Sequence, residues 1–173
     1  PVTGCSSART TRRPYTTRSF HPTLVPAIPL AKDLAALAPG DINPVFFAGS
    51  GSEANDTNLR MVRTYWAQKG QPEKSHVISR KNAYHGSSVG SASLGGMTPM
   101  HEQGGLPIPG IHHIGQPDWY TEGGEMTPED FGLMRARELE ATLEGLGADK
   151  VPALTAEPVQ GPGRARAHRR RCR

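Results

Sequence analysis

The chain has 173 residues, of which 35% are hydrophobic, with 20 Gly and 16 Pro, a composition that suits about one domain with poorly folding ends. Its two cysteines, Cys5 and Cys172, give no basis for a disulfide framework or a cysteine-based metal site. No apolar run approaches the roughly 20 residues that cross a bilayer. The N-terminal residues also lack the apolar stretch of a secretory signal, so we expect a cytoplasmic protein.

The net charge of +4 comes from the two ends of the chain. Residues 1–20 hold four arginines and residues 164–173 hold six, without any acidic residue, whereas residues 21–163 carry 10 basic and 16 acidic groups. We therefore predict a disordered basic segment (1–20), a folded region (21–163) and a disordered arginine-rich tail (164–173). Such a tail can bind nucleic acid, but no aromatic residue stands between its arginines. We favour a solvated tail without a nucleic-acid partner.

The first half of the folded region predicts a β-α-β unit. Leucines 30, 34 and 37 have helical spacing, and Pro39 with Gly40 ends that helix. The run VFFA (45–48) predicts a buried strand, and GSGS (49–52) opens a helix through Trp66. The run HVIS (76–79) predicts the next strand. Strand, glycine loop, helix and strand in this order are typical of a parallel, doubly wound α/β sheet.

The second half predicts further helices and strands. Small residues over 86–96 favour a tightly packed helix, and residues 97–124 predict mostly loop with a short strand at 111–114. Thr127 is the predicted N-cap of a helix that begins with Pro128 and runs to about Leu146. A last strand is predicted at 151–156. Glu157 follows its carboxyl end, where open parallel sheets bind ligands.

The segment GSGSEAND (49–56) is the strongest local signal for binding chemistry. Glycines bring backbone N–H groups close to a ligand, and the free donors at a helix start attract phosphate. The hydroxyls of Ser50 and Ser52 can add donors, but an ordinary turn capped by either serine explains the pattern equally well. The letters also fit G-x-G-x-x-A, a dinucleotide fingerprint, with Arg80 and Lys81 placed for an NADP phosphate.

Three segments in order carry a more specific resemblance. FFAGSGSEAND (46–56), ISRKNAYHGS (78–87) and EPVQG (157–161) resemble successive blocks of the class III, pyridoxal-phosphate-dependent aminotransferases. The resemblance covers about residues 30–163 and is closest to the omega-aminotransferase and pyruvate-linked branch. It implies part of a fold-type-I large domain, α/β with a mostly parallel sheet and flanking helices. It also implies transfer of an amino group between an amine or amino acid and a keto acid, pyridoxal 5′-phosphate as cofactor, and a homodimer.

The resemblance assigns a role to six residues. Gly51 and Ser52 would bind the cofactor phosphate, with Ser50 adding a hydroxyl. Tyr84 would stack on the pyridine ring, and His85 would lie beside it. Glu157 would support the aspartate that pairs with the pyridine nitrogen. The adjacent histidines at 112 and 113 lack a third ligand, so we expect no metal site.

The family's Schiff-base lysine and pyridine-nitrogen aspartate follow the third block, and no residue of this sequence matches either of them. We therefore expect the chain to be incomplete and inactive alone, with weak cofactor binding and an exposed sheet edge that favours aggregation. Whether it is an enzyme by itself stays open at this point. Two alternatives are an NADP-binding oxidoreductase fragment and a non-catalytic protein with a nucleic-acid-binding tail.

Overall fold

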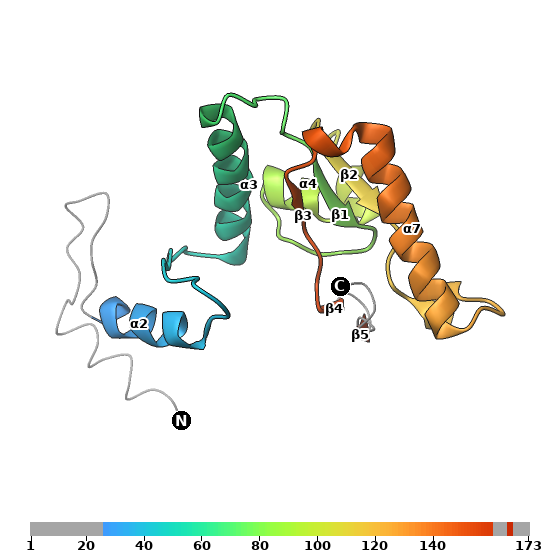
Figure 1. Ribbon diagram of the computed structural model, residues 1–173, viewed down its shortest axis with the longest axis horizontal. Helices are drawn as coiled ribbons and strands as arrows, with labels where there is room; N and C mark the ends of the chain where they lie inside the picture. The colour runs from blue at the N-terminus through green and yellow to red at the C-terminus, as the bar shows by residue number, and fades with distance from the viewer. Residues whose placement is uncertain (1–25, 161–165, 168–173) are drawn as a thin grey trace. The chain divides into compact units, whose positions relative to one another are not determined.

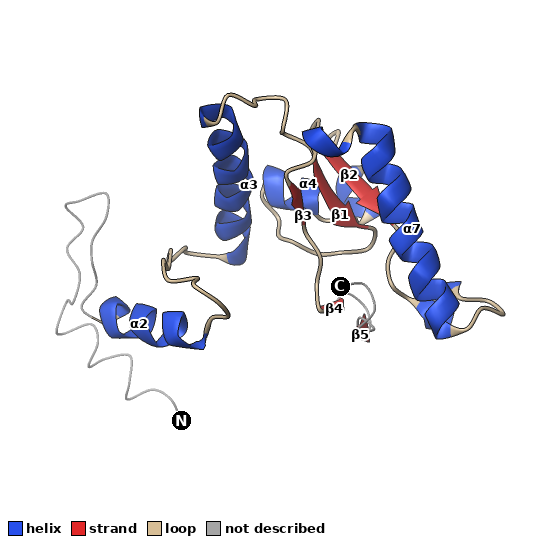
Figure 2. Cartoon of the chain, viewed as in Figure 1, coloured by secondary structure: helices blue, strands red, loops and turns tan. Residues whose placement is uncertain are grey.

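The computed structural model describes residues 26–160 and 166–167. They belong to two compact units, one ending at Phe47 and the other beginning at Ala48. Figure 2 shows the helices, the short strands and the loops that connect them. The predicted basic segment at 1–20 lies outside the described residues, as does the arginine-rich tail except for residues 166–167.

The first unit contains one described helix, α2 (Ala27–Leu37), which confirms the helix predicted from the leucine spacing. The strand predicted at residues 45–48 is wrong: these residues are irregular, and Phe46 is 63% exposed. A strand is stabilised by backbone pairing with a neighbour, and no segment of the described residues pairs with this run. Its β propensity alone is therefore insufficient.

The second unit is built on a parallel three-stranded sheet of β1 (Val77–Arg80), β2 (Ile111–Ile114) and β3 (Ala153–Leu154). The strand order is β2-β1-β3, and Val77 pairs with Ile111 on one side and with Ala153 on the other. All four residues of β1 are buried, as a central parallel strand with both faces covered requires. The predicted α/β class and parallel sheet are confirmed, although the sheet begins at β1 instead of at residues 45–48.

Helical crossovers cover both faces of this sheet. The crossovers of parallel strands are right-handed, and β2 and β3 lie on opposite sides of β1, so the two connections pass over opposite faces. Figure 1 shows α4 and α7 on opposite sides of the strands. The β1–β2 connection holds α4 (Val89–Leu94) and α5 (Thr98–His101). The β2–β3 connection holds α6 (Trp119–Glu122), α7 (Pro128–Leu146) and the 3₁₀ turn Ala148–Lys150.

The apolar core lies between the sheet, α4 and the helix α3 (Gly51–Gln68). Its buried residues are Leu59 on α3, Val77 on β1, Leu94 on α4 and Ile111 on β2. On the other face, α7 buries Phe131. The predicted start of α7 is confirmed, since the Thr127 hydroxyl accepts a hydrogen bond from the Asp130 amide at 3.1 Å.

A second, two-stranded sheet follows β3. Its strands, β4 (Val159–Gln160) and β5 (Arg166–Ala167), pair antiparallel. Within the described ranges, none of the helices has the length and apolar character needed to span a bilayer.

Candidate functional site

The N-terminus of α3 is closed by a reciprocal cap. Ser50 is the N-cap residue, and its hydroxyl oxygen accepts a hydrogen bond from the Glu53 amide at 3.1 Å. The Glu53 carboxylate in turn accepts from the Gly49 amide at 2.7 Å. Of the two serines that could cap the helix, Ser50 is therefore the N-cap and Ser52 is not. The capping contact uses one acceptor position of the Ser50 hydroxyl.

The next two amides, those of Gly51 and Ser52, have no hydrogen-bond acceptor within the described part of the chain. They are among the first N–H groups of an 18-residue helix, where the helix dipole concentrates positive charge. The side-chain position at the helix start is open, because a Cβ added at Gly51 would meet nothing within 4 Å apart from its chain neighbours and the backbone of its own helix. Two free amides at an open helix start fit a phosphate or another small anion.

The loop that follows β1 packs directly on this helix start. The Ser87 amide donates a hydrogen bond to the Ser52 hydroxyl oxygen at 3.1 Å. Gly86, with φ of 134°, lies so close that a Cβ there would be 2.3 Å from that oxygen, so only glycine fits. Since the Ser52 oxygen accepts from Ser87, its own proton remains able to donate to a ligand.

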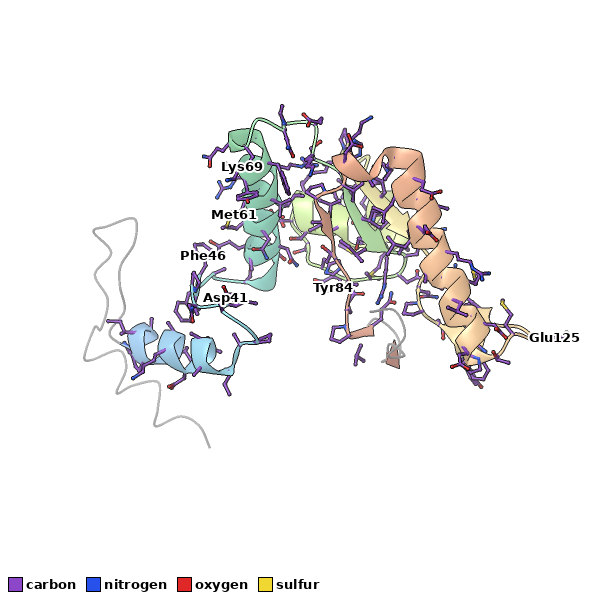
Figure 3. All side chains as sticks on the ribbon, in the orientation of Figure 1. Asp41, Phe46, Met61, Lys69, Tyr84 and Glu125 are labelled. Carbon is purple, nitrogen blue, oxygen red and sulfur yellow. The ribbon has the colours of Figure 1, made fainter. Side chains whose placement is uncertain are left out.

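A second contact fixes the same loop. The Asn55 side-chain amide on α3 donates to the His85 carbonyl at 2.7 Å. The preceding residue, Tyr84, is 54% exposed, which leaves its ring able to contact a ligand. Figure 3 shows Tyr84 on the loop that runs past the lower end of α3. The structure thus brings the predicted residues 50–52 and 84–85 to one end of the second unit.

His85 links this loop to Glu157, which lies beyond the carboxyl end of β3. His85 Nε2 and Glu157 Oε1 are 2.7 Å apart, although the hydrogen-bond geometry is poor, and they form an ion pair when His85 is protonated. Arg80 Nη1 donates to the Glu157 carbonyl at 3.0 Å. Burial raises the pKa of Glu157, but the contact with His85, Glu157's own amide and the charges of His85 and Arg80 outweigh it. The pKa of Glu157 is therefore lowered.

Three contacts of this site were not predicted from the sequence. Asn55 binds the His85 loop, Arg80 binds the Glu157 backbone, and Gln160 donates to the Lys81 carbonyl at 2.8 Å. All three residues lie in or beside the segments that carry the family resemblance. Their partners are between 30 and 79 residues away in the chain, so local spacing gives no signal for them.

The histidines at 112 and 113 lie on β2 and contact different partners. Consecutive strand residues point to opposite faces, so His112 meets His76 at 2.8 Å and the His113 ring lies 5.1 Å from that of His101. Burial, then the charge of the neighbouring histidine, lowers the pKa of both, although backbone carbonyls partly offset the shift at His113. No group of three or more His, Cys, Asp or Glu suited to a metal occurs among the described residues.

Comparison with known proteins places the chain in a family. The sequence model of "Aminotransferase class-III" matches residues 14–170. The chain is 57% identical over 146 residues to putrescine–pyruvate aminotransferase of Pseudomonas aeruginosa, which is 84% of this chain and 31% of that protein. It is 39% identical over 135 residues to beta-alanine–pyruvate aminotransferase of the same organism, covering 76% of this chain and 30% of that protein.

The solved structures agree. An omega transaminase of Pseudomonas jessenii in complex with PMP superposes with a TM-score of 0.90 at 35% identity, over 98% of this chain and 38% of that one. The described fold is thus part of the fold-type-I transaminase fold, and the chain spans about a third of the length of the curated relatives it matches. This likeness overturns the dinucleotide-binding alternative. The chain belongs to the class III aminotransferase family.

Proposed function

We propose that this chain forms the phosphate-binding part of a pyridoxal-phosphate-dependent transaminase, which transfers an amino group between an amine or amino acid and a keto acid. Family membership supports the reaction class. The names of the two Pseudomonas aeruginosa relatives, which pair putrescine or beta-alanine with pyruvate, support an aliphatic amine donor and a small keto acid acceptor. The proposed assembly of the whole protein is a homodimer.

The observation that carries this proposal is the open start of α3. The amides of Gly51 and Ser52 would hold the phosphate, with the Ser52 hydroxyl as a third donor. Ser50 keeps the helix start in place through its contact with Glu53. The donor set consists of neutral N–H and O–H groups at the positive end of a helix, which suits a dianionic phosphate ester.

Three further side chains would orient the ring of the cofactor. Tyr84 offers a half-exposed ring for stacking. His85 lies next to Tyr84 in the chain and pairs with Glu157 when it is protonated. A Glu157 oxygen buried without a hydrogen-bond partner among the described residues can accept one more donor. When bound, pyridoxal phosphate supplies the electron sink for amino-group transfer. The residues of this chain bind and orient it.

Binding of pyridoxamine 5′-phosphate (PMP) to the full chain tests this proposal. PMP carries an amine in place of the aldehyde and does not react with surface lysines, so titration reports the non-covalent site alone. Calorimetry should show that PMP binds at least about tenfold more tightly than pyridoxamine, because only PMP presents a phosphate to the helix start.

Ser52→Ala should weaken PMP binding by at least about tenfold, the effect of losing one hydrogen bond to a charged group, and leave pyridoxamine unchanged. The matched control is Thr64→Ala, which removes a hydroxyl from the last third of the same helix, away from its start. Equal affinity of the unmodified chain for PMP and pyridoxamine would refute the proposed phosphate site.

A further inference from the structure

A buried hydroxyl on α4, that of Ser91, joins α4 to the first turn of α3. Ser91 is fully buried, and its Oγ donates to the Ser52 carbonyl at 2.7 Å and to Asp56 Oδ1 at 3.0 Å. A serine hydroxyl has one proton, so the two acceptors share it. Both acceptors belong to α3, and Ser52 is also the residue whose amide and hydroxyl face the proposed phosphate.

Asp56 lies one helical turn after Ser52, and its carboxylate points toward α4. A Cβ added at Gly90 would lie 2.6 Å from Asp56 Oδ1, so the carboxylate packs against the backbone of α4 where no side chain fits. The helices α3 and α4 contact each other at this interface, which contains Asp56, Gly90 and Ser91. Figure 1 shows the two helices side by side. The Asp56–Ser91 pair therefore sets how closely the two helices approach.

The same α3–α4 interface determines where the loop before α4 lies. A Cβ at Gly86 would be 2.8 Å from the Ser91 Cβ as well as 2.3 Å from the Ser52 hydroxyl, so Gly86 is held between these two serines. On one side of Gly86 the Ser87 amide binds Ser52, and on the other the His85 carbonyl binds Asn55. A shift of Ser91 away from α3 would move this whole loop, and with it Tyr84 and His85.

We propose that Ser91, together with Asp56, is a positioning residue for the phosphate site. Its hydroxyl fixes α4 and the 84–88 loop against the first turn of α3. The Ser52 oxygen then stays bonded to the Ser87 amide, and the Ser52 proton stays directed at the ligand. This role rests on the proposed function of the helix start. Ser91 itself touches neither phosphate nor ring, since it is fully buried and its proton is already shared.

The chain supplies a matched control in Ser93, on the same short helix. Ser93 is also fully buried, and its hydroxyl donates to the Val89 carbonyl at 2.6 Å and accepts from the Ile108 amide at 3.0 Å. Ser93→Ala and Ser91→Ala thus each remove one buried, hydrogen-bonded hydroxyl, at a similar expected loss of thermal stability. Only Ser91 makes its contacts to α3.

The experiment compares both variants of the full chain by titration with PMP and pyridoxamine and by amide hydrogen exchange. Ser91→Ala should weaken PMP binding by about fivefold, leave pyridoxamine within about twofold, and accelerate exchange of the Ser87 amide. Ser93→Ala should leave all three unchanged. A merely structural role for Ser91 predicts that the two variants behave alike.

Three results would overturn the inference. The first is unchanged PMP affinity in a folded Ser91→Ala variant, and the second is equal weakening by Ser93→Ala. If Ser91→Ala fails to fold, Asp56→Ala removes the second acceptor without emptying the buried serine position, and unchanged PMP affinity there is the third. These results leave the proposed function intact, because the unmodified chain still prefers PMP. Loss of that preference in the unmodified chain would refute both.

Discussion

The helices α2 and α3 show what turns a helix start into a candidate binding site. Both helices were predicted from the sequence, but α2 begins after Pro26 without a side-chain cap and buries none of its residues. The helix α3 has the Ser50 cap with Glu53 and buries Leu59. Each helix start carries free amides by geometry alone. At α3 a cap and a second segment fix the direction in which those amides point.

The second segment consists of residues 84–91, the loop after β1 and the start of α4. Four hydrogen bonds join it to the first two turns of α3. Ser87 and Ser91 each donate to Ser52, Ser91 also donates to Asp56, and Asn55 on α3 donates to the His85 carbonyl. Between α2 and the other described residues, no comparable polar contact to a distant segment occurs. Removing the contacts at α3 should therefore make its start behave like that of α2, which is helical but lacks a side-chain cap.

The largest expected effect comes from Gly86→Ala. A methyl group there would lie 2.3 Å from the Ser52 hydroxyl and 2.8 Å from the Ser91 Cβ, at a φ of 134° that alanine rarely adopts. Strain and overpacking together should lower the free energy of unfolding by about 4 kcal/mol. Urea denaturation followed by circular dichroism measures this loss, and PMP binding should disappear with it.

The control is Gly145→Ala near the end of α7, where an added Cβ meets no atom within 4 Å. That substitution should raise the free energy of unfolding by up to about 1 kcal/mol, because alanine is the better helix former. If Gly86→Ala were as well tolerated as Gly145→Ala, the close packing of the loop on Ser52 would be wrong.

The next prediction compares the loss of stability when a leucine is truncated on α3 and on α2. Leu59→Ala should cost about 3 kcal/mol, since Leu59 is 8% exposed and contacts the core formed by Val77, Leu94 and Ile111. Leu34→Ala on α2 should change stability by less than about 0.5 kcal/mol, because Leu34 is 41% exposed. Parallel thermal melts test the pair. Equal losses would mean that the leucines of α2 are buried in solution.

The sequence predicted elements well where one local signal was sufficient. The cap and proline at 127 and 128 gave the start of α7, and the leucine spacing gave α2. The strand at 45–48 failed because a strand depends on a partner elsewhere in the chain. The same reason limits the site: glycine and serine patterns indicated the helix start, whereas the roles of Asn55, Ser91 and Gln160 depend on tertiary contacts.

The smallest effect concerns the pH dependence of stability at Glu157. Its pKa is lowered from the ordinary value of 4.5 because the contact with His85, its own amide and the charge of Arg80 outweigh the opposing effect of burial. A carboxyl whose pKa is lower in the folded state stabilises the protein above pH 4.5, and this contribution is lost as the pH falls through the folded-state pKa. Glu157→Gln should therefore lose less stability than the unmodified chain on acidification below that value.

Urea denaturation of both proteins at neutral pH and in steps below pH 4.5 tests this expectation. The difference in unfolding free energy between them should shrink as the pH falls, because protonation removes from Glu157 the charge that the variant never had. The control is Glu140→Gln, which removes an exposed carboxylate from α7. An equal response in that variant would assign the effect to net charge, and the lowered pKa of Glu157 would then have no part in holding the His85 loop at the site.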